Sequence, residues 1–449
     1  LLAVMARDVP AVKRVCEVSL AEEAILTGAK RPIILLKKRT AAILPYEIAP
    51  AQKTLGMMLP YTPLHYILYK SGIEYLVMTS GNASGLPICY KDPDAFVKLK
   101  GIADYFLFHN RDIQVPTDDS VVRVVNSQEM ISRCGRGYAP LTHTLKTNQG
   151  IIALGAEQKA SVTLAQNGYG TLSQYLGDLA TYEALLEYEH VIAHLKALLS
   201  GGHTAVAHDL NIDYLSTRFA ERQAVKQIAI QHHHAHMASC MAEHGLDGDA
   251  IGVIYDGTGL GLDGAVWGGE FLIGNAKEYR RAAHWNYVTL QGGDLAVKQP
   301  WRCAVCYLHS VNINAFEIIN NIEKNKITAV YHALKEEILC CRSSSMGRLF
   351  DAVAAIIGIR DEIKYDAQAA IELEAITEPG VKDSYSYHIE VNAEQIIIGY
   401  DGIIHGIIED LQLGVNIGRI SAKFHNTVIG ETVECVCRIR DKTGVNVVV

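Results

Sequence analysis

Four histidines lie within the six residues of the sequence QHHHAH, residues 231–236. Twenty residues after His236, Asp256 opens the glycine-rich sequence DGTGLGLDG. On a helix, His232 and His236 are one turn apart, so their imidazoles point the same way. Two imidazoles at this spacing can bind one metal ion from one side, and a carboxylate completes a ligand set suited to zinc or iron. The spacing therefore predicts a divalent metal site at His232, His236 and Asp256.

The residues between the two predicted ligands limit the chemistry. His233, His234 and Ala235 occupy the interval, so the glutamate that zinc peptidases carry there is missing and peptide hydrolysis is not predicted. His233 and His234 point elsewhere, and either could contact a substrate or a phosphate. The alternative is a helix start with hydrated histidines; the aspartate and glycines that follow favour the metal site.

Gly257, Gly259 and Gly261 are predicted to contact a nucleotide, because glycine lets backbone N–H groups approach phosphate oxygens. Residues 151–165 and 250–274 each have the pattern strand, short polar turn, strand. Two such hairpins facing phosphate are typical of the actin, sugar-kinase and Hsp70-type ATPases. Hairpin turns need glycine in any case, so this spacing alone is weak evidence.

The elements that must position these residues are also predicted from the sequence. The run KQIAI at 226–230 predicts a strand, followed by a helix that ends near Gly245. Short apolar runs at 31–39 and 73–85 predict buried strands. A polar stretch at 142–150 is the predicted linker between two domains, 1–147 and 148–449. The clearest amphipathic helix lies at 184–200, with an apolar face of Leu185, Tyr188, Ile192, Leu195 and Leu199.

Composition excludes several classes of protein. The 449 residues are 49% hydrophobic, which fits a well-cored protein of two domains. The net charge of −8 disfavours a nucleic-acid partner, and no apolar run is long enough to cross a membrane. Ten scattered cysteines include one CxxC, Cys303 and Cys306, which we interpret as buried thiols on a helix. We therefore expect a cytoplasmic protein with reduced cysteines.

Longer segments resemble the HypF family of hydrogenase maturation carbamoyltransferases, over essentially the whole chain. In the second part the similar segments are QHHHAHMASCMAEHGL, DGTGLGLDGAVWGGEF, KQPWRCA, SSSMGRLFDAVAA and AQAAIELE. In the first part they are LLAVMARDVPAVKRVCEVSLAEEAIL, LGMMLPYTPLHYIL, LVMTSGNASGLPI, FHNRDIQVPTDDSVVR and RGYAP.

The resemblance implies a fold of α/β and α+β type. Residues 1–147 would form a YrdC-like twisted-sheet domain that makes carbamoyl-adenylate from ATP and carbamate derived from carbamoyl phosphate. Residues 148–449 would form a TsaD-like, actin/Hsp70-type (ribonuclease H-like) ATPase domain that binds metal and nucleotide. It would pass the carbamoyl group to the C-terminal cysteine of a HypE-like partner, for synthesis of the cyanide ligands. The implied cofactors are ATP with magnesium and a divalent iron or zinc ion.

Residue by residue, the family's metal ligands fall on His232, His236 and Asp256, in agreement with the spacing argument. The sequence SGNASG resembles the S-x-N-x-S-G motif of YrdC-like proteins, which implicates a loop in nucleotide or acyl binding, although a simple turn also suits this composition. Similarity elsewhere implicates a serine and two arginines near the anionic substrate. The implied substrate-binding residues of the first part are Ser80, Asn82, Ser84, Ser120, Arg133 and Arg136.

The chain also departs from the family pattern. An N-terminal acylphosphatase-like domain, a zinc-finger pair and part of the YrdC-like domain are expected to precede Leu1, and further residues to follow Val449. Asp366 and Ala367 stand where glutamate and glycine are usual, and the added methyl could crowd a ligand.

Two other functions are considered. One is an enzyme that forms threonylcarbamoyladenosine on tRNA, which the acidic charge and the fusion of both modules in one chain disfavour. The other is an inactive metal-binding scaffold that docks HypE.

Overall fold

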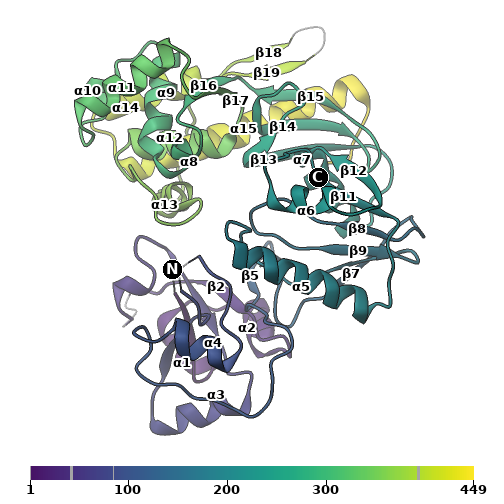
Figure 1. The fold of residues 1–449 in the computed structure, drawn as a ribbon. Helices are drawn as coiled ribbons and strands as arrows, with labels where there is room; N and C mark the ends of the chain where they lie inside the picture. The colour runs from purple at the N-terminus through teal and green to yellow at the C-terminus, as the bar shows by residue number, and fades with distance from the viewer. Residues whose placement is uncertain (1, 41–43, 84, 392–394) are drawn as a thin grey trace. The chain divides into compact units, whose positions relative to one another are not determined.

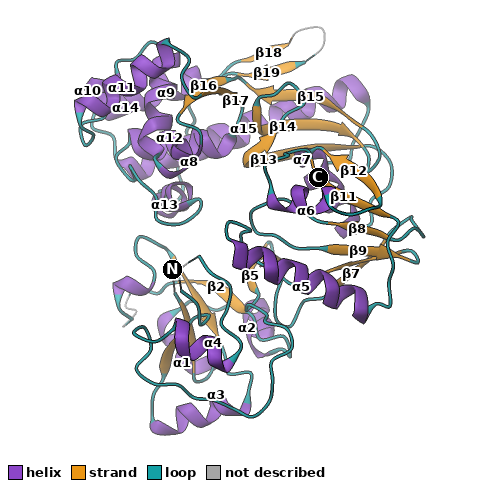
Figure 2. Ribbon diagram, in the orientation of Figure 1, coloured by secondary structure: helices purple, strands orange, loops and turns teal. Residues whose placement is uncertain are grey.

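The computed structural model describes residues 2–40, 44–83, 85–391 and 395–449; Ser84 lies outside these ranges. The chain forms two compact units, Leu1–Ile230 and Gln231–Val449, whose elements are drawn in Figures 1 and 2. The domain boundary placed after residue 147 stays a prediction, since the compact units divide at 230/231.

The first unit contains two sheets. The first has the strand order β4-β1-β3-β2-β5-β6 and mixes parallel and antiparallel pairs. Its strands are β1 (Ala3–Ala6), β2 (Ile33–Lys37), β3 (Thr54–Met58), β4 (Tyr75–Met78), β5 (Val121–Val125) and β6 (Gln128–Arg133). Its helices are α1 (Val9–Val15), α2 (Leu20–Thr27), α3 (Pro63–Leu68) and α4 (Asp92–Lys98).

The second sheet of this unit has the order β12-β11-β8-β9-β10-β7. Its strands are β7 (Leu141–Thr144), β8 (Ile151–Ala153), β9 (Thr163–Gln166), β10 (Tyr169–Leu172), β11 (Ala205–Asp209) and β12 (Lys226–Ile230), with helices α5 (Tyr182–Leu198) and α6 (Leu215–Glu221). Tyr188, Ile192 and Leu195 of α5 are buried in its core, which confirms the predicted amphipathic helix.

The second unit is built on a third sheet of order β16-β17-β14-β15-β19-β18, with β13 paired to β14. Its strands are β13 (Ala250–Leu260), β14 (Val266–Gly274), β15 (Tyr279–Trp285), β16 (Val288–Gln291), β17 (Cys340–Ser343), β18 (Ile389–Val391) and β19 (Ile396–Ile398). Its helices are α7 (His232–Glu243), α8 (Asp294–Lys298), α9 (Pro300–Ser310), α10 (Ala315–Ile318), α11 (Lys324–Lys335), α12 (Met346–Ile356), α13 (Gln368–Ile376), α14 (Asp401–Gln412) and α15 (Ile417–Thr443). A large apolar core joins β14, β15, α9, α12 and α14.

Several predicted elements are confirmed. The strand at 226–230 is β12, the helix that follows is α7, and the two predicted hairpins are the antiparallel pairs β8–β9 and β13–β14. Cys303 and Cys306 lie buried on α9, as expected of core thiols.

Three details differ from the prediction. Residues 142–144 of the predicted linker 142–150 belong to β7, because an edge strand needs only backbone pairing, here with β10. β4 was predicted to be buried, but it lies at the sheet edge and Val77 is 47% exposed. Asp256 was expected at a strand end; β13 instead continues to Leu260, with an irregularity in its pairing between Tyr255 and Gly259.

Ala367, where glycine was expected, has a φ of +57° and precedes α13. This left-handed conformation is one that glycine adopts without strain. None of the described helices combines the length and apolarity needed to cross a membrane.

Candidate functional site

The predicted metal-ligand helix is α7, and Gln231 caps it. The side-chain oxygen of Gln231 accepts a hydrogen bond from the backbone N–H of His234, at 2.9 Å. This cap satisfies one of the free N–H groups at the helix start and fixes where the helix begins. As a result His232 and His236 stand one turn apart on the same side of α7.

The structure brings the three predicted ligands together. His232 Nε2 lies 3.0 Å from Asp256 Oδ2, His236 Nε2 lies 3.9 Å from the same oxygen, and the two Nε2 atoms are 3.2 Å apart. All three ligand atoms fall within 4.8 Å of one another. The His236 side chain is 55% exposed and that of His232 only 14%, so the group opens to solvent on the His236 side.

The donor set fits a divalent cation. Asp256 Oδ2 is buried and has no partner with hydrogen-bond geometry in the described part of the chain, although His232 is so close. Burial alone would raise the pKa of Asp256, but the contact with His232 and the charges of both imidazoles lower it to about 2. The carboxylate is therefore ionised at neutral pH, and two nitrogens and an oxygen converge as ligands of zinc or iron do.

The backbone around Asp256 is clamped by the start of α12. Ser345 Oγ lies 2.9 Å from the carbonyl oxygen of Asp256 and 2.8 Å from that of Gly257. Gly268 of β14 packs against the same segment, where a Cβ would lie 2.5 Å from the Asp256 carbonyl oxygen. Asp256 is thus positioned by two neighbouring backbones as well as by its own strand.

The three predicted phosphate-contacting glycines lie beside these residues. Gly257 is held by Ser345, and a Cβ on Gly259 would come within 2.5 Å of His233 Cε1. A Cβ on Gly261 would overlap the Trp267 indole, 2.2 Å from its Nε1. Packing against rings therefore accounts for glycine at 259 and 261, while their contact with a nucleotide stays a prediction.

The two intervening histidines have different surroundings. His234 Nε2 lies 2.8 Å from the carbonyl oxygen of Asn275, and its ring packs on Tyr279. His233 is completely buried, and burial lowers its pKa to about 4. His234 is thus engaged in a structural contact, whereas His233 lies next to the ligand His232, with ring centroids 5.4 Å apart.

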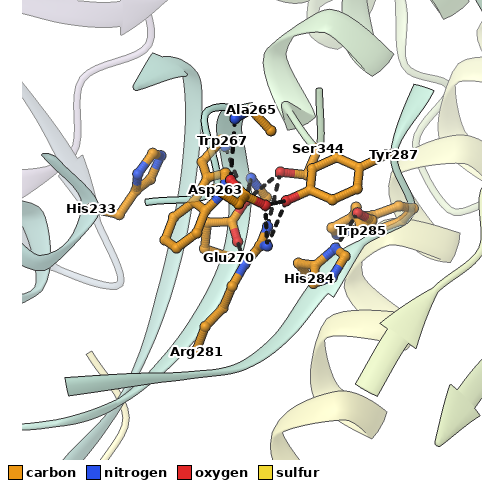
Figure 3. Close-up of polar contacts among 12 residues, drawn as sticks. His233, Asp263, Ala265, Trp267, Glu270, Arg281, His284, Trp285, Tyr287 and Ser344 are labelled. Carbon is orange, nitrogen blue, oxygen red and sulfur yellow. Dashed lines mark hydrogen bonds and ion pairs between the residues drawn. The ribbon is translucent and has the colours of Figure 1, made fainter. Parts of the chain in front are cut away.

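A buried polar network, which the sequence did not reveal, connects β14 and β15 (Figure 3). Glu270 is fully buried; one oxygen accepts from Gly268 N, Gly269 N and Ser344 Oγ, and the other lies 2.6 Å from Arg281 Nε. Each polar atom of a buried network needs a partner, and here the carboxylate has four.

The same network holds Trp267. The Arg281 guanidinium lies 4.0 Å from the Trp267 ring, and the indole N–H donates to Asp263 Oδ1 at 2.9 Å. Tyr287 donates to the other oxygen of Asp263 and accepts from Arg281. The pairing of β14 with β15 brings Arg281 to Trp267, so no short motif signalled this contact.

In the first unit, a cavity of about 330 Å³ collects some of the predicted substrate-binding residues. Ser80 and Arg133 line it, together with Tyr61, Asp118 and Asp119. Burial raises the pKa of Asp118, although the charge of Arg133 opposes the effect. The cavity therefore offers one guanidinium and two carboxyl groups to a polar ligand.

Ser120, Arg136 and Asn82 do not line this cavity but contact residues next to it. Ser120 is buried, accepts from Gly135 N and donates to the Arg136 carbonyl. Arg136 pairs with Asp119 at 2.6 Å and lies 3.4 Å from the Tyr61 ring.

Arg136 also donates to the carbonyls of Lys30 and Arg31. Asn82 donates to the carbonyls of Ala83 and Leu86. These contacts indicate positioning roles for Ser120, Arg136 and Asn82.

Comparison with known families agrees with this arrangement. Residues 1–135 match the Sua5/YciO/YrdC model, described as "Telomere recombination". Residues 146–243 match "HypF Kae1-like domain", and residues 252–449 match "Carbamoyltransferase, Kae1-like Domain, second subdomain". The two HypF models together match more than half of the chain.

Individual relatives carry the same name. The chain is 37% identical to "Carbamoyltransferase HypF" of Synechocystis sp. over 91% of its length, covering 56% of that protein. It is 35% identical to "Carbamoyltransferase HypF2" of Cupriavidus necator over its whole length, covering 61% of that protein. The chain thus spans about three fifths of the length of these relatives.

A solved structure extends the likeness to the fold. A "full-length HypF in the phosphate- and nucleotide-bound form" superposes with a TM-score of 0.96 at 41% identity, covering all of this chain and 59% of that one. The predicted combination of a YrdC-like domain and an actin/Hsp70-type ATPase domain, here Kae1-like, is confirmed. The chain therefore belongs to the HypF family.

Proposed function

We propose that this chain is the adenylating and transferring part of a carbamoyltransferase of nickel–iron hydrogenase maturation. It would act in the cytoplasm on carbamate derived from carbamoyl phosphate, with ATP and magnesium. The acceptor would be the C-terminal cysteine of a HypE-like protein, and neither nucleic acid nor membrane would take part.

The first step would take place in the cavity of the first unit. A carbamate oxygen attacks the α-phosphorus of ATP, the bond to the β-phosphate bridging oxygen breaks, and pyrophosphate leaves. Arg133 faces this cavity, and its guanidinium suits an anionic carbamate or phosphate. Ser80 lines the same cavity and donates to Asn82 Oδ1 at 2.7 Å, which orients its hydroxyl within the loop.

The second step would take place beside α7. The partner's thiolate attacks the carbamoyl carbon, the bond to the phosphate oxygen breaks, and AMP leaves. A divalent cation held by His232, His236 and Asp256 would supply positive charge for the phosphate of the adenylate. The chain's own residues bind and orient: Asp256 stays ionised, and Gly257–Gly261 keep the strand close to the imidazoles.

The convergence of His232, His236 and Asp256 is the observation that carries the proposal. Those residues are separated by up to 24 positions in the sequence, yet their ligand atoms lie within 4.8 Å. Such a group next to a glycine-rich strand, in a chain of the HypF family, supports phosphate chemistry at this site.

Carbamate-dependent exchange of labelled pyrophosphate into ATP tests the proposal with the complete protein. We expect exchange with carbamate, and transfer of labelled carbamoyl to the HypE-like partner but not to a partner whose C-terminal cysteine is replaced by serine. Metal binding without any exchange would favour the inactive scaffold instead. A shift of tRNA in native gels would favour the threonylcarbamoyladenosine enzyme.

A further inference from the structure

His233 lies between the two histidines that approach Asp256, yet its own role is not explained by the metal group. Its side chain is completely buried. The ring packs over Gly259, where a Cβ would come within 2.5 Å of Cε1, and faces Trp267 at 5.9 Å between ring centroids. The imidazole therefore has a fixed position beside the metal group.

Gln231 determines which nitrogen of His233 carries the proton. The Gln231 oxygen accepts from His234 N, so its other terminal atom is the amide nitrogen, which also donates to the Leu260 carbonyl at 3.2 Å. That nitrogen lies 3.0 Å from His233 Nδ1. Because an amide N–H can only donate, Nδ1 must accept, and the proton of the neutral ring lies on Nε2.

The resulting Nε2–H has no acceptor among the described residues, although it is buried. An unsatisfied buried donor is costly and uncommon in native proteins. His234 next to it shows the ordinary solution, a backbone carbonyl at 2.8 Å. A donor that is held in place but unsatisfied points to an acceptor that arrives with a ligand.

We propose that His233 donates its Nε2–H to an anionic oxygen of a phosphoryl group bound beside His232, His236 and Asp256. Gln231 is then a positioning residue, because it fixes the tautomer that makes this donation possible. The inference rests on the proposed function, which brings a phosphoryl group to this site. It adds a specific donor from the protein to the charge of the bound cation.

The tautomer can be measured without any activity. Histidine labelled with ¹⁵N in the intact chain gives distinct shifts for protonated and unprotonated ring nitrogens, and His233→Gln identifies the His233 signals. We expect the proton on Nε2, and on Nδ1 in Gln231→Glu, whose carboxylate keeps the cap to His234 but accepts from the ring. A wild-type proton on Nδ1 overturns the proposal.

Ligand contact is tested by titrating inorganic phosphate into the metal-loaded chain by calorimetry. His233→Phe fills the space without a donor and should weaken phosphate binding about 10-fold to 100-fold, the worth of one hydrogen bond to a charged group. His233→Gln, which offers an N–H near the position of Nε2, should restore much of this affinity. The control is His234→Phe, which removes the Asn275 contact and should lower thermal stability but leave phosphate affinity little changed.

Unchanged phosphate affinity in His233→Phe, with the metal still bound, would mean that an internal water satisfies the donor, and the proposal falls. Failure of the proposed function looks different. In that case carbamoyl transfer is absent from the wild type, while the tautomer and the order of phosphate affinities remain as expected.

Discussion

The burial of Glu431 in the second unit predicts that the free energy of unfolding depends on pH. This residue of α15 is completely buried, and neither carboxylate oxygen has a hydrogen-bond partner in the described part of the chain. Burial, together with the negative charges of the nearby acids Asp401 of α14 and Glu434 of α15, raises its pKa from 4.5 to about 9. The carboxyl group is therefore neutral in the folded protein at pH 7.

The sign of the effect follows from proton linkage. Because the pKa of Glu431 is raised in the folded state, the folded protein holds a proton that the unfolded chain releases. The contribution of this group to the free energy of unfolding is fully present below pH 4.5 and is lost as the pH rises towards 9. The interval between the two pKa values corresponds to about 6 kcal/mol at about 1.4 kcal/mol per pH unit. At pH 8 the wild type should have lost about 5 kcal/mol of this contribution.

Glu431→Gln keeps the shape of the side chain and cannot ionise. We expect its free energy of unfolding to match that of the wild type near pH 5 and to exceed it increasingly between pH 6 and pH 8. Urea unfolding followed by tryptophan fluorescence measures this, because all three tryptophans, Trp267, Trp285 and Trp301, lie in the second unit. Glu434→Gln is the matched control, since that side chain is partly exposed and hydrogen-bonded to Arg438.

The difference between wild type and Glu431→Gln must depend on pH for the reasoning to hold. A constant difference from pH 5 to pH 8 would mean that Glu431 is not a neutral buried acid. The same pH dependence in Glu434→Gln relative to the wild type would assign the effect to the general charge of α15 instead.

Three further predictions concern the sites and the backbone. Gly259→Ala should weaken metal binding, measured by calorimetry, because the added Cβ would meet the imidazoles of α7. Gly430→Ala is the control: its Cβ would make only ordinary contacts, and it should stabilise α15 by about 0.5–1 kcal/mol. Arg136→Lys should lower the melting temperature of the first unit because it loses several fixed contacts. Arg133→Lys loses the hydrogen bond to the Asp119 carbonyl, so it should lower the melting temperature less and weaken ATP binding. Ala367→Gly should raise the unfolding free energy by about 1 kcal/mol, read from urea denaturation, because it relieves a φ of +57°.

The metal group could be predicted from the sequence because its residue types and their spacing can be recognised within short segments. Two histidines four residues apart on a helix define one face, and an aspartate in an apolar strand with glycines after it has few roles other than chemistry. The prediction of α7 needed only helix formers and the glycine near its end. What the sequence could not give is that β13 runs past Asp256, since glycines suit a turn and a strand irregularity equally well.

The residues of the polar network beside the metal group could not be predicted from the sequence, for a physical reason. Glu270 and Arg281 meet because β14 pairs with β15, and Ser344, 74 residues after Glu270, joins them because β17 pairs with β14. The same holds for Arg136, whose sequence suggested an anion ligand although Asp119 and two backbone carbonyls already engage it. Long-range pairing, rather than residue type, decides such roles.

Direct measurement of bound metal tests the central claim that His232, His236 and Asp256 form one cation site. Elemental analysis of the purified chain, before and after chelation and reloading with zinc or ferrous iron, should give one tightly bound ion per chain. His232→Ala, His236→Ala and Asp256→Asn should each lose it while keeping the wild-type tryptophan fluorescence. An ion that remains in all three folded variants, or a wild type that binds none after reloading, would contradict the account.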